Sequence, residues 1–137
     1  HLSLRRQRQM CIRDRLCFWL EKILLQQTMI SQNTTAMLTI IKNYPVYLIY
    51  VLVAAPIMEE LVFRKAIFGN LITLTNPLIA GIISCLLFSV VHADGHFLTY
   101  AIIGGILCWI YAKSGRLQSS MIAHMLMNLV IVIISFK

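Results

Sequence analysis

The stretch Tyr47-Leu-Ile-Tyr-Val-Leu-Val-Ala-Ala-Pro-Ile-Met-Glu-Glu-Leu-Val-Phe-Arg64 places two adjacent glutamates, Glu59 and Glu60, in an otherwise apolar run. One charged side chain at the centre of a bilayer costs roughly 2.5 to 3.5 kcal/mol on insertion scales, so a pair of carboxylates is rarely kept there without a function. The run therefore predicts a membrane helix whose glutamates face a polar site inside the protein.

The composition supports a membrane protein. The chain has 137 residues, of which 59% are hydrophobic, and its mean hydropathy is +0.80. That leaves too little polar surface for a water-soluble globule of this length. The net charge is +7, but five of the twelve basic residues lie within the first fifteen positions, so the charge does not indicate a nucleic-acid partner. The four cysteines form no C-x-x-C pair and are interpreted as small apolar residues.

The chain divides into three parts. Residues 1–15 form a basic tail with no apolar period, which we treat as a candidate non-native segment and exclude from the fold. Residues 16–43 mix apolar and polar side chains, and we expect an interfacial amphipathic helix followed by a Ser/Gln/Asn/Thr-rich linker. Residues 44–137 form the functional domain.

This domain predicts four helices, and hence an all-α membrane protein with a bundle of about four transmembrane helices in the cell membrane. Their expected spans are Tyr44 to Leu74, Pro77 to Ala93, Phe97 to Ala112 and Ser119 to Phe136. Asn76 before Pro77 is typical of a helix N-cap, and Gly115 is suited to a left-handed helix end. Basic residues near both hairpin turns favour a cytoplasmic location for these turns.

Helix arithmetic brings four polar residues into one layer. If the hairpins turn near Thr75 and Gly115, Glu59 lies 16 residues before the first turn and His92 lies 17 after it. At ~1.5 Å per residue these two have almost the same depth, and His124 and Asn128 fall within roughly 6 to 11 Å of it.

Spacing within the first helix separates the two glutamates. Arg64 lies four residues after Glu60, a spacing that favours an ion pair and leaves Glu60 ionised and structural. Glu59 is then available to exchange protons and activate water as a general base. Pro56 lies one turn before Glu60 and predicts a kink beside the carboxylates.

The polar residues of the later helices complete a hydrolytic site. His124 and Asn128 lie one turn apart and could donate hydrogen bonds to an oxyanion, while His92 could orient the water. Structural interpretations remain open for each: an ion-pair cluster at the glutamates, a core histidine at His92, and interhelical hydrogen bonds at His124 and Asn128. His96 has metal-ligand spacing from His92, but the intervening Asp-Gly indicates a loop residue.

Three motifs in order on successive apolar helices resemble a known family. Glu59–Arg64 is similar to an E-E-x-x-x-R motif, Phe88–His92 to F-x-x-x-H, and His124–Asn128 to H-x-x-x-N. Together they resemble the CAAX-protease and bacteriocin-processing (CPBP, or Abi) family of intramembrane proteases over residues 44–137. Members usually carry additional membrane helices ahead of the first motif.

The resemblance implies an intramembrane endopeptidase in which Glu59 activates water, His92 assists, and His124 with Asn128 stabilises the oxyanion. Hydrolysis without a metal and hydrolysis with a divalent metal such as zinc both fit, the second with Glu59, His92 and His124 as ligands. The expected partners are membrane lipid and a peptide or protein substrate, prenylated in eukaryotic members. A non-catalytic peptide-binding or bacteriocin-immunity protein is the main alternative, and a proton or ion relay is a third.

Overall fold

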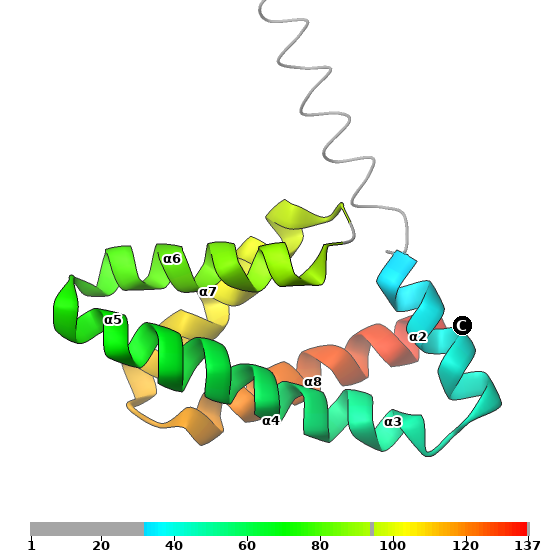
Figure 1. The fold of residues 1–137 in the computed structure, drawn as a ribbon. Coiled ribbons are helices and arrows are strands. Elements are labelled where there is room, and N and C mark those ends of the chain that lie inside the picture. Colours follow the sequence, from blue (N-terminus) through cyan, green and yellow to red (C-terminus); the bar gives the residue numbers. More distant parts are fainter. Residues whose placement is uncertain (1–31, 94, 137) are drawn as a thin grey trace, which may run out of the picture. The chain divides into compact units, whose positions relative to one another are not determined.

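The computed structural model describes residues 32–93 and 95–136, and all regular elements in these ranges are helices (Figure 1). In chain order they are α2 (Gln32–Asn43), α3 (Tyr47–Ile49), η1 (Tyr50–Ala54), α4 (Ala55–Glu60), η2 (Leu61–Phe68), α5 (Gly69–Leu74), α6 (Pro77–His92), α7 (Phe97–Ser114) and α8 (Leu117–Ser135). The all-α class is confirmed. The expectations for the basic tail and for the amphipathic helix before residue 32 lie outside the described residues.

Residues 47–74 run as one helical segment with two π-helical stretches, η1 and η2, on either side of the glutamates. In η1 the Ala55 N–H donates to the Tyr50 carbonyl, five residues back. A proline ring collides with the carbonyl four residues before it in a regular α-helix, and a wider turn relieves that collision at Pro56. In η2 the Gly69 N–H likewise reaches the Arg64 carbonyl. The irregularity beside the carboxylates thus takes the form of π turns.

The helix ends of the two hairpins follow from local side-chain chemistry. Asn76 Oδ1 accepts the Ile79 N–H at 2.9 Å, which confirms the predicted N-cap ahead of Pro77. Gly115 closes α7 with a φ of 63°, and its N–H donates to the Tyr111 carbonyl at 2.9 Å. α6 ends at His92, one residue earlier than expected, because Ala93 adopts a left-handed conformation.

The expectation of a Ser/Gln/Asn/Thr-rich linker at the end of residues 16–43 was wrong, because this part is helical. Residues 32–43 form α2, in which Met37, Ile40 and Ile41 are spaced three and four apart and Ile41 is buried. Thr39 Oγ1 donates to the Thr35 carbonyl within the helix, so its hydroxyl needs no water. A Ser/Gln/Asn/Thr-rich composition predicts a loop only where the segment has no apolar stripe, and α2 has one.

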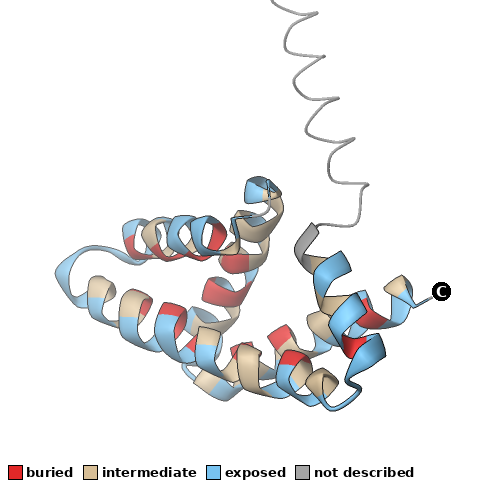
Figure 2. Ribbon diagram, turned by 45° about the vertical axis from the view of Figure 1, so that its right-hand side comes forward, coloured by how far each residue is buried: buried red, intermediate tan, exposed pale blue. Residues whose placement is uncertain are grey.

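Burial in this domain differs from that of a soluble protein. Fully or nearly fully buried side chains include several polar ones, namely Glu60, Arg64, Ser84, Ser89, Ser120 and His124. Large apolar side chains such as Leu74, Leu78, Trp109 and Ile134 are exposed, and exposed positions run along every helix (Figure 2). α7 and α8 are long and apolar enough to cross a bilayer, and α6 is a shorter apolar helix. A lipid environment explains this pattern, which confirms an all-α membrane protein.

The interface of α6 with α7 depends on a small residue. Gly104 is buried, and a Cβ atom there would lie 3.3 Å from both the Cys85 Cα and the Phe88 Cδ1. The absence of a side chain therefore lets the two backbones approach closely. The same approach packs the Phe88 ring against α7, next to the candidate site.

Candidate active site

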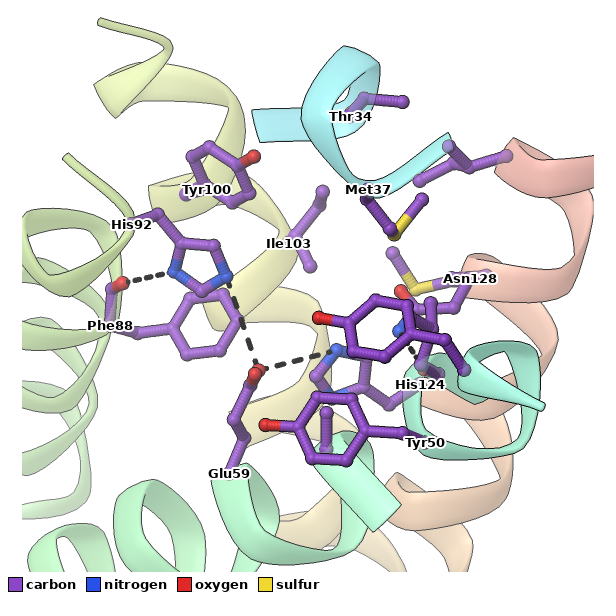
Figure 3. A pocket seen from close by; sticks show the side chains of 15 residues that line it. Thr34, Met37, Tyr50, Glu59, Phe88, His92, Tyr100, Ile103, His124 and Asn128 are labelled. Atoms are coloured by element: carbon purple, nitrogen blue, oxygen red, sulfur yellow. Dashed lines mark hydrogen bonds and ion pairs between the residues drawn. The ribbon is translucent and has the colours of Figure 1, made fainter. Parts of the chain in front are cut away.

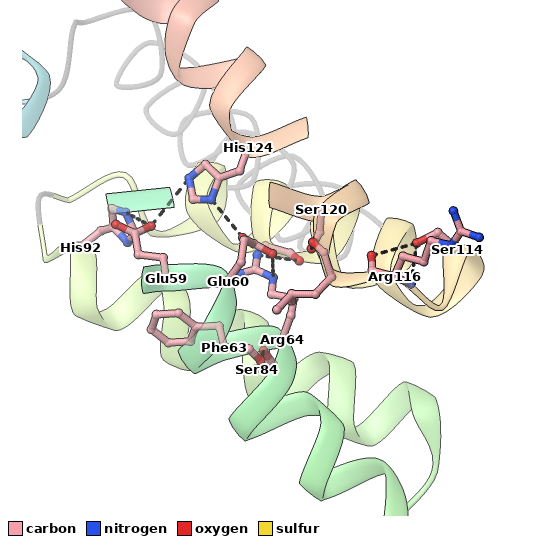
Figure 4. A network of polar contacts seen from close by, with 12 residues as sticks. Glu59, Glu60, Phe63, Arg64, Ser84, His92, Ser114, Arg116, Ser120 and His124 are labelled. Atoms are coloured by element: carbon pink, nitrogen blue, oxygen red, sulfur yellow. Dashed lines mark hydrogen bonds and ion pairs between the residues drawn. The ribbon is translucent and has the colours of Figure 1, made fainter. Parts of the chain in front are cut away.

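Glu60 is the centre of a buried network of charged groups (Figure 4). Its Oε2 lies 3.2 Å from Arg64 Nε, and its Oε1 lies 2.9 Å from His124 Nδ1. A carboxylate only accepts, so Nδ1 of His124 carries the hydrogen and donates it. The structure thus places Arg64 against Glu60, as the spacing predicts, and adds His124 as a second partner of the same carboxylate.

Arg64 has no exposed surface, and its charge is met by groups from three helices. Besides Glu60, the Arg64 Nη2 donates to the Gly104 carbonyl at 3.3 Å. The guanidinium carbon lies 4.6 Å from the centre of the Phe88 ring, where a cation is attracted by the aromatic face. A buried cation held in this way anchors one side of Glu60, and hence the position of His124.

Glu59 points into a pocket from the neighbouring position on the same helix. Its side chain is 31% exposed, and its Oε2 lies 3.6 Å from His124 Nε2 and 4.0 Å from His92 Nε2. Figure 3 shows the Glu59 carboxylate between the two imidazole rings. Both distances exceed that of a direct hydrogen bond, so there is room for a small molecule to bridge these groups.

His92 is oriented by its own helix and by α7. Its Nδ1 lies 2.7 Å from the Phe88 carbonyl, which can only accept, so Nδ1 is the donor and Nε2 faces Glu59. The Tyr100 ring stacks on the imidazole at a centroid distance of 4.0 Å and an interplanar angle of 25°. The Phe88 ring contacts it from another side at 4.5 Å. In the neutral form of His92, these contacts present the Nε2 lone pair to the pocket.

Asn128 lies in the same pocket but is not bonded to the glutamates. Its Nδ2 donates to the Val51 carbonyl at 3.1 Å, which ties α8 to η1. An amide NH2 group has two hydrogens, so this bond leaves one for another acceptor. The structure therefore brings Glu59, His92 and His124 into direct proximity and places Asn128 one helical turn beyond His124.

The pocket around these groups has a cavity volume of about 230 Å³ and a lining of mixed chemistry. Glu59, His92, His124 and Asn128 supply carboxylate, imidazole and amide groups. Apolar and aromatic side chains also line it, among them Met37, Tyr47, Tyr50, Ile103, Met127 and Ile131. Among the described residues that line the pocket there is no lysine or arginine.

Several pocket residues were not found from the sequence. Tyr47 and Tyr50 lie three apart and stack on each other at 5.2 Å, a spacing that could have identified them as one aromatic face. Tyr100 contacts His92 across two helices, for which the sequence carries no signal. Met37 was assigned to a linker and instead reaches the pocket from α2.

A metal ion does not fit the arrangement as it stands. Within residues 32–93 and 95–136, no group of three histidine, cysteine, aspartate or glutamate side chains is arranged to hold one. Of the three candidate ligands, His124 has its Nδ1 bonded to Glu60 and His92 has its Nδ1 bonded to the Phe88 carbonyl, so each histidine could offer a metal only its Nε2.

Comparison with known proteins identifies relatives of this chain. The Rce1-like family, described as type II CAAX prenyl endopeptidase, matches residues 41–130. The "Putative membrane peptidase YdiL" of Bacillus subtilis is 40% identical over 108 residues, which cover 78% of this chain and 44% of that protein. The "Membrane-embedded CAAX protease MroQ" of Staphylococcus aureus is 34% identical over 111 residues, 76% of this chain and 45% of the relative.

A third relative extends the comparison. The "UPF0177 protein YxdF" of Lactococcus lactis is 33% identical over 120 residues, which cover 81% of this chain and 65% of that protein. The chain thus spans less than half of the length of the first two relatives. No solved structure matches it. The family match covers all the residues of the site from Glu59 to Asn128.

Proposed function

We propose a peptidase function for this chain, which belongs to the Rce1-like family of type II CAAX prenyl endopeptidases. The reaction is hydrolysis of a peptide bond in a membrane-associated peptide or protein by water that Glu59 activates. The observation that carries this proposal is the position of Glu59, whose carboxylate faces two imidazole nitrogens across gaps of 3.6 and 4.0 Å in a pocket.

The gap between Glu59 and His92 suits a water molecule. Glu59 Oε2 and the unprotonated His92 Nε2 both accept hydrogen bonds, so a water about 2.8 Å from each would donate one hydrogen to each. Its oxygen lone pairs would then face the rest of the pocket. As the oxygen attacks the substrate carbonyl carbon, Glu59 takes the proton and later delivers it to the leaving amine.

His124 and Asn128 can stabilise the negative charge on the substrate oxygen. Because His124 Nδ1 donates to Glu60, its Nε2 can donate to an oxyanion only when the ring is an imidazolium. Glu60 accepts the Nδ1 hydrogen of this ring at 2.9 Å and is itself held by Arg64 at 3.2 Å, which fixes the direction of Nε2. Glu60 thus supports the oxyanion site through His124, while the second amide hydrogen of Asn128 supplies the other donor.

The pocket chemistry favours an internal peptide bond next to an apolar side chain. Apolar and aromatic residues, including Met37, Tyr50 and Ile131, line the same pocket as Glu59 and would bury such a side chain. A free α-carboxylate beside the scissile bond would meet Glu59 with no lysine or arginine among the described lining residues to balance it. This favours an endopeptidase acting on apolar or lipid-anchored segments.

The test is cleavage of a library of membrane-anchored peptides by the purified protein in lipid vesicles. Glu59→Gln, which keeps the shape of the side chain, should lower turnover by roughly 10² to 10⁴, the usual range for a general base. The matched control is Met58→Gln, an exposed change on the same helix, which should leave turnover unaltered.

A chelator arm and a binding arm separate the alternatives. Cleavage that persists with a chelator and disappears in Glu59→Gln supports metal-free hydrolysis. Loss of wild-type cleavage with the chelator would show that a metal participates. A protein that binds peptides without cleaving any, and does so equally well as Glu59→Gln, would replace the peptidase by a peptide-binding or immunity function, which the apolar side chains of the pocket could also serve.

A further inference from the structure

The backbone carbonyl of Val51 has lost its usual helical partner. In an α-helix this oxygen would accept the Ala55 N–H, but that N–H is bonded to the Tyr50 carbonyl in the π turn. With the π-helical spacing of five residues the donor would be residue 56, and Pro56 has no N–H. Neither helical register therefore supplies a backbone donor to Val51.

The side chain of Asn128 supplies the missing donor from 77 residues away in the sequence. Its Nδ2 lies 3.1 Å from the Val51 oxygen, and Val51 itself is buried. A carbonyl without a partner in such a place is unfavourable, so the open position selects a donor from the facing helix. Asn128 lies on the inner side of α8, where it lines the pocket beside Val51.

We infer that Pro56 is a positioning residue for Asn128: by withholding a backbone N–H from the Val51 carbonyl, it fixes one amide hydrogen of Asn128 there and aims the other into the pocket. The catalytic part of this inference rests on the proposed function, because it takes Asn128 as an oxyanion donor. The structural part, the competition between an N–H at position 56 and the Asn128 amide for one carbonyl, does not depend on any activity.

Two substitutions restore the missing N–H with different side-chain volumes. Pro56→Ala and Pro56→Val both let the backbone serve Val51, in either the α or the π register. Because Pro56 is fully buried, the smaller alanine also leaves space and the valine does not. An effect common to both variants therefore reports on the N–H, and a difference between them reports on packing. Pro77→Ala is the matched control, since Pro77 is exposed in the first turn of α6.

The first measurement compares kcat and KM for a cleaved membrane peptide. Both Pro56 variants should lower kcat by roughly tenfold to a hundredfold, somewhat less than complete loss of an oxyanion donor, and leave KM within about twofold. Asn128→Ala should lower kcat in the wild-type background and add little in the Pro56→Val background. Wild-type kcat in both Pro56 variants, or an equal further loss from Asn128→Ala in both backgrounds, would overturn the inference.

The second measurement is a double-mutant cycle on unfolding, which needs no substrate. In the wild-type background Asn128→Ala leaves the Val51 carbonyl unsatisfied, and the unfolding equilibrium constant should rise roughly tenfold to a hundredfold. In Pro56→Val the same change should raise it less than about threefold. Equal effects in the two backgrounds would refute the competition for Val51. If the wild type cleaves nothing, the proposed function fails, and this cycle still decides the structural part.

Discussion

Replacing glutamate by glutamine should mainly lower stability at position 60 and mainly lower activity at position 59. Glu59→Gln and Glu60→Gln change the same chemical group, one residue apart on the same helix. Glu60 has no exposed surface and lies between Arg64 Nε at 3.2 Å and His124 Nδ1 at 2.9 Å. Glu59 is 31% exposed and makes no contact shorter than 3.6 Å with either histidine.

These surroundings set the expected magnitudes. Removing the Glu60 charge leaves Arg64 buried without its anionic partner, and loss of one member of a buried pair costs about 3–5 kcal/mol of unfolding free energy. An amide at this position also turns an N–H donor toward one of two donors, so it cannot satisfy both Arg64 and His124. For Glu59→Gln the stability change should be within about 0.5 kcal/mol, because long contacts of a partly exposed carboxylate contribute little.

The assay is titration of each variant in mixed micelles with a denaturing detergent, with helix content followed by circular dichroism. Cleavage of a membrane-anchored peptide is measured in parallel and normalised to the folded fraction. Met58→Gln, an exposed neighbour, controls for the effect of glutamine on the helix. Equal destabilisation by the two glutamate variants, or full activity of folded Glu59→Gln, would refute the division of roles.

Two further predictions concern the frame of the site. Gly104→Ala should destabilise the protein by about 1–3 kcal/mol, because its Cβ would lie 3.3 Å from the Cys85 Cα. Gly105→Ala should be nearly neutral, because the nearest atom to its Cβ, the Cys85 Sγ, lies 3.9 Å away. Unfolding of the two variants by detergent titration measures the difference. Tyr100→Leu should lower kcat roughly twofold to tenfold, since ring stacking on His92 is worth about 0.5–1.5 kcal/mol. Unchanged kcat with a folded protein would show that the contacts with Phe88 orient His92 without the Tyr100 ring.

The sequence predicted the elements that local chemistry determines. The Asn76 cap and the left-handed Gly115 depend on residues within one turn of themselves, and both occur as expected. The convergence of Glu59 with His92 follows from counting residues along a hairpin, and the structure brings these two side chains to 4.0 Å. The short turn and the regular rise of α6 make such arithmetic useful, and the π-helical η2 between Glu59 and the turn does not prevent the convergence.

What the sequence could not predict depends on side-chain direction across helices. Position along α8 places His124 near both glutamates, but only the rotation of the helix and the ring decides which nitrogen meets Glu60 and which faces Glu59. The bond from Asn128 to Val51 likewise depends on a π turn, which hydrophobic periodicity does not reveal. α2 was missed because a polar composition concealed an apolar stripe that needs tertiary packing to be stable.

The order of the functional residues along the chain also has a consequence for biosynthesis. Glu59 and Glu60 lie on α4, His92 at the end of α6, and His124 on α8, so the groups come from three separate helices. A ribosome must make all three helices, and the membrane must receive and assemble them, before both imidazoles can meet the carboxylates. Until α8 is in place, a growing chain lacks the second histidine of the site. Assembly of the polar network around Glu60 is therefore the last step in building the site, because it waits for α8.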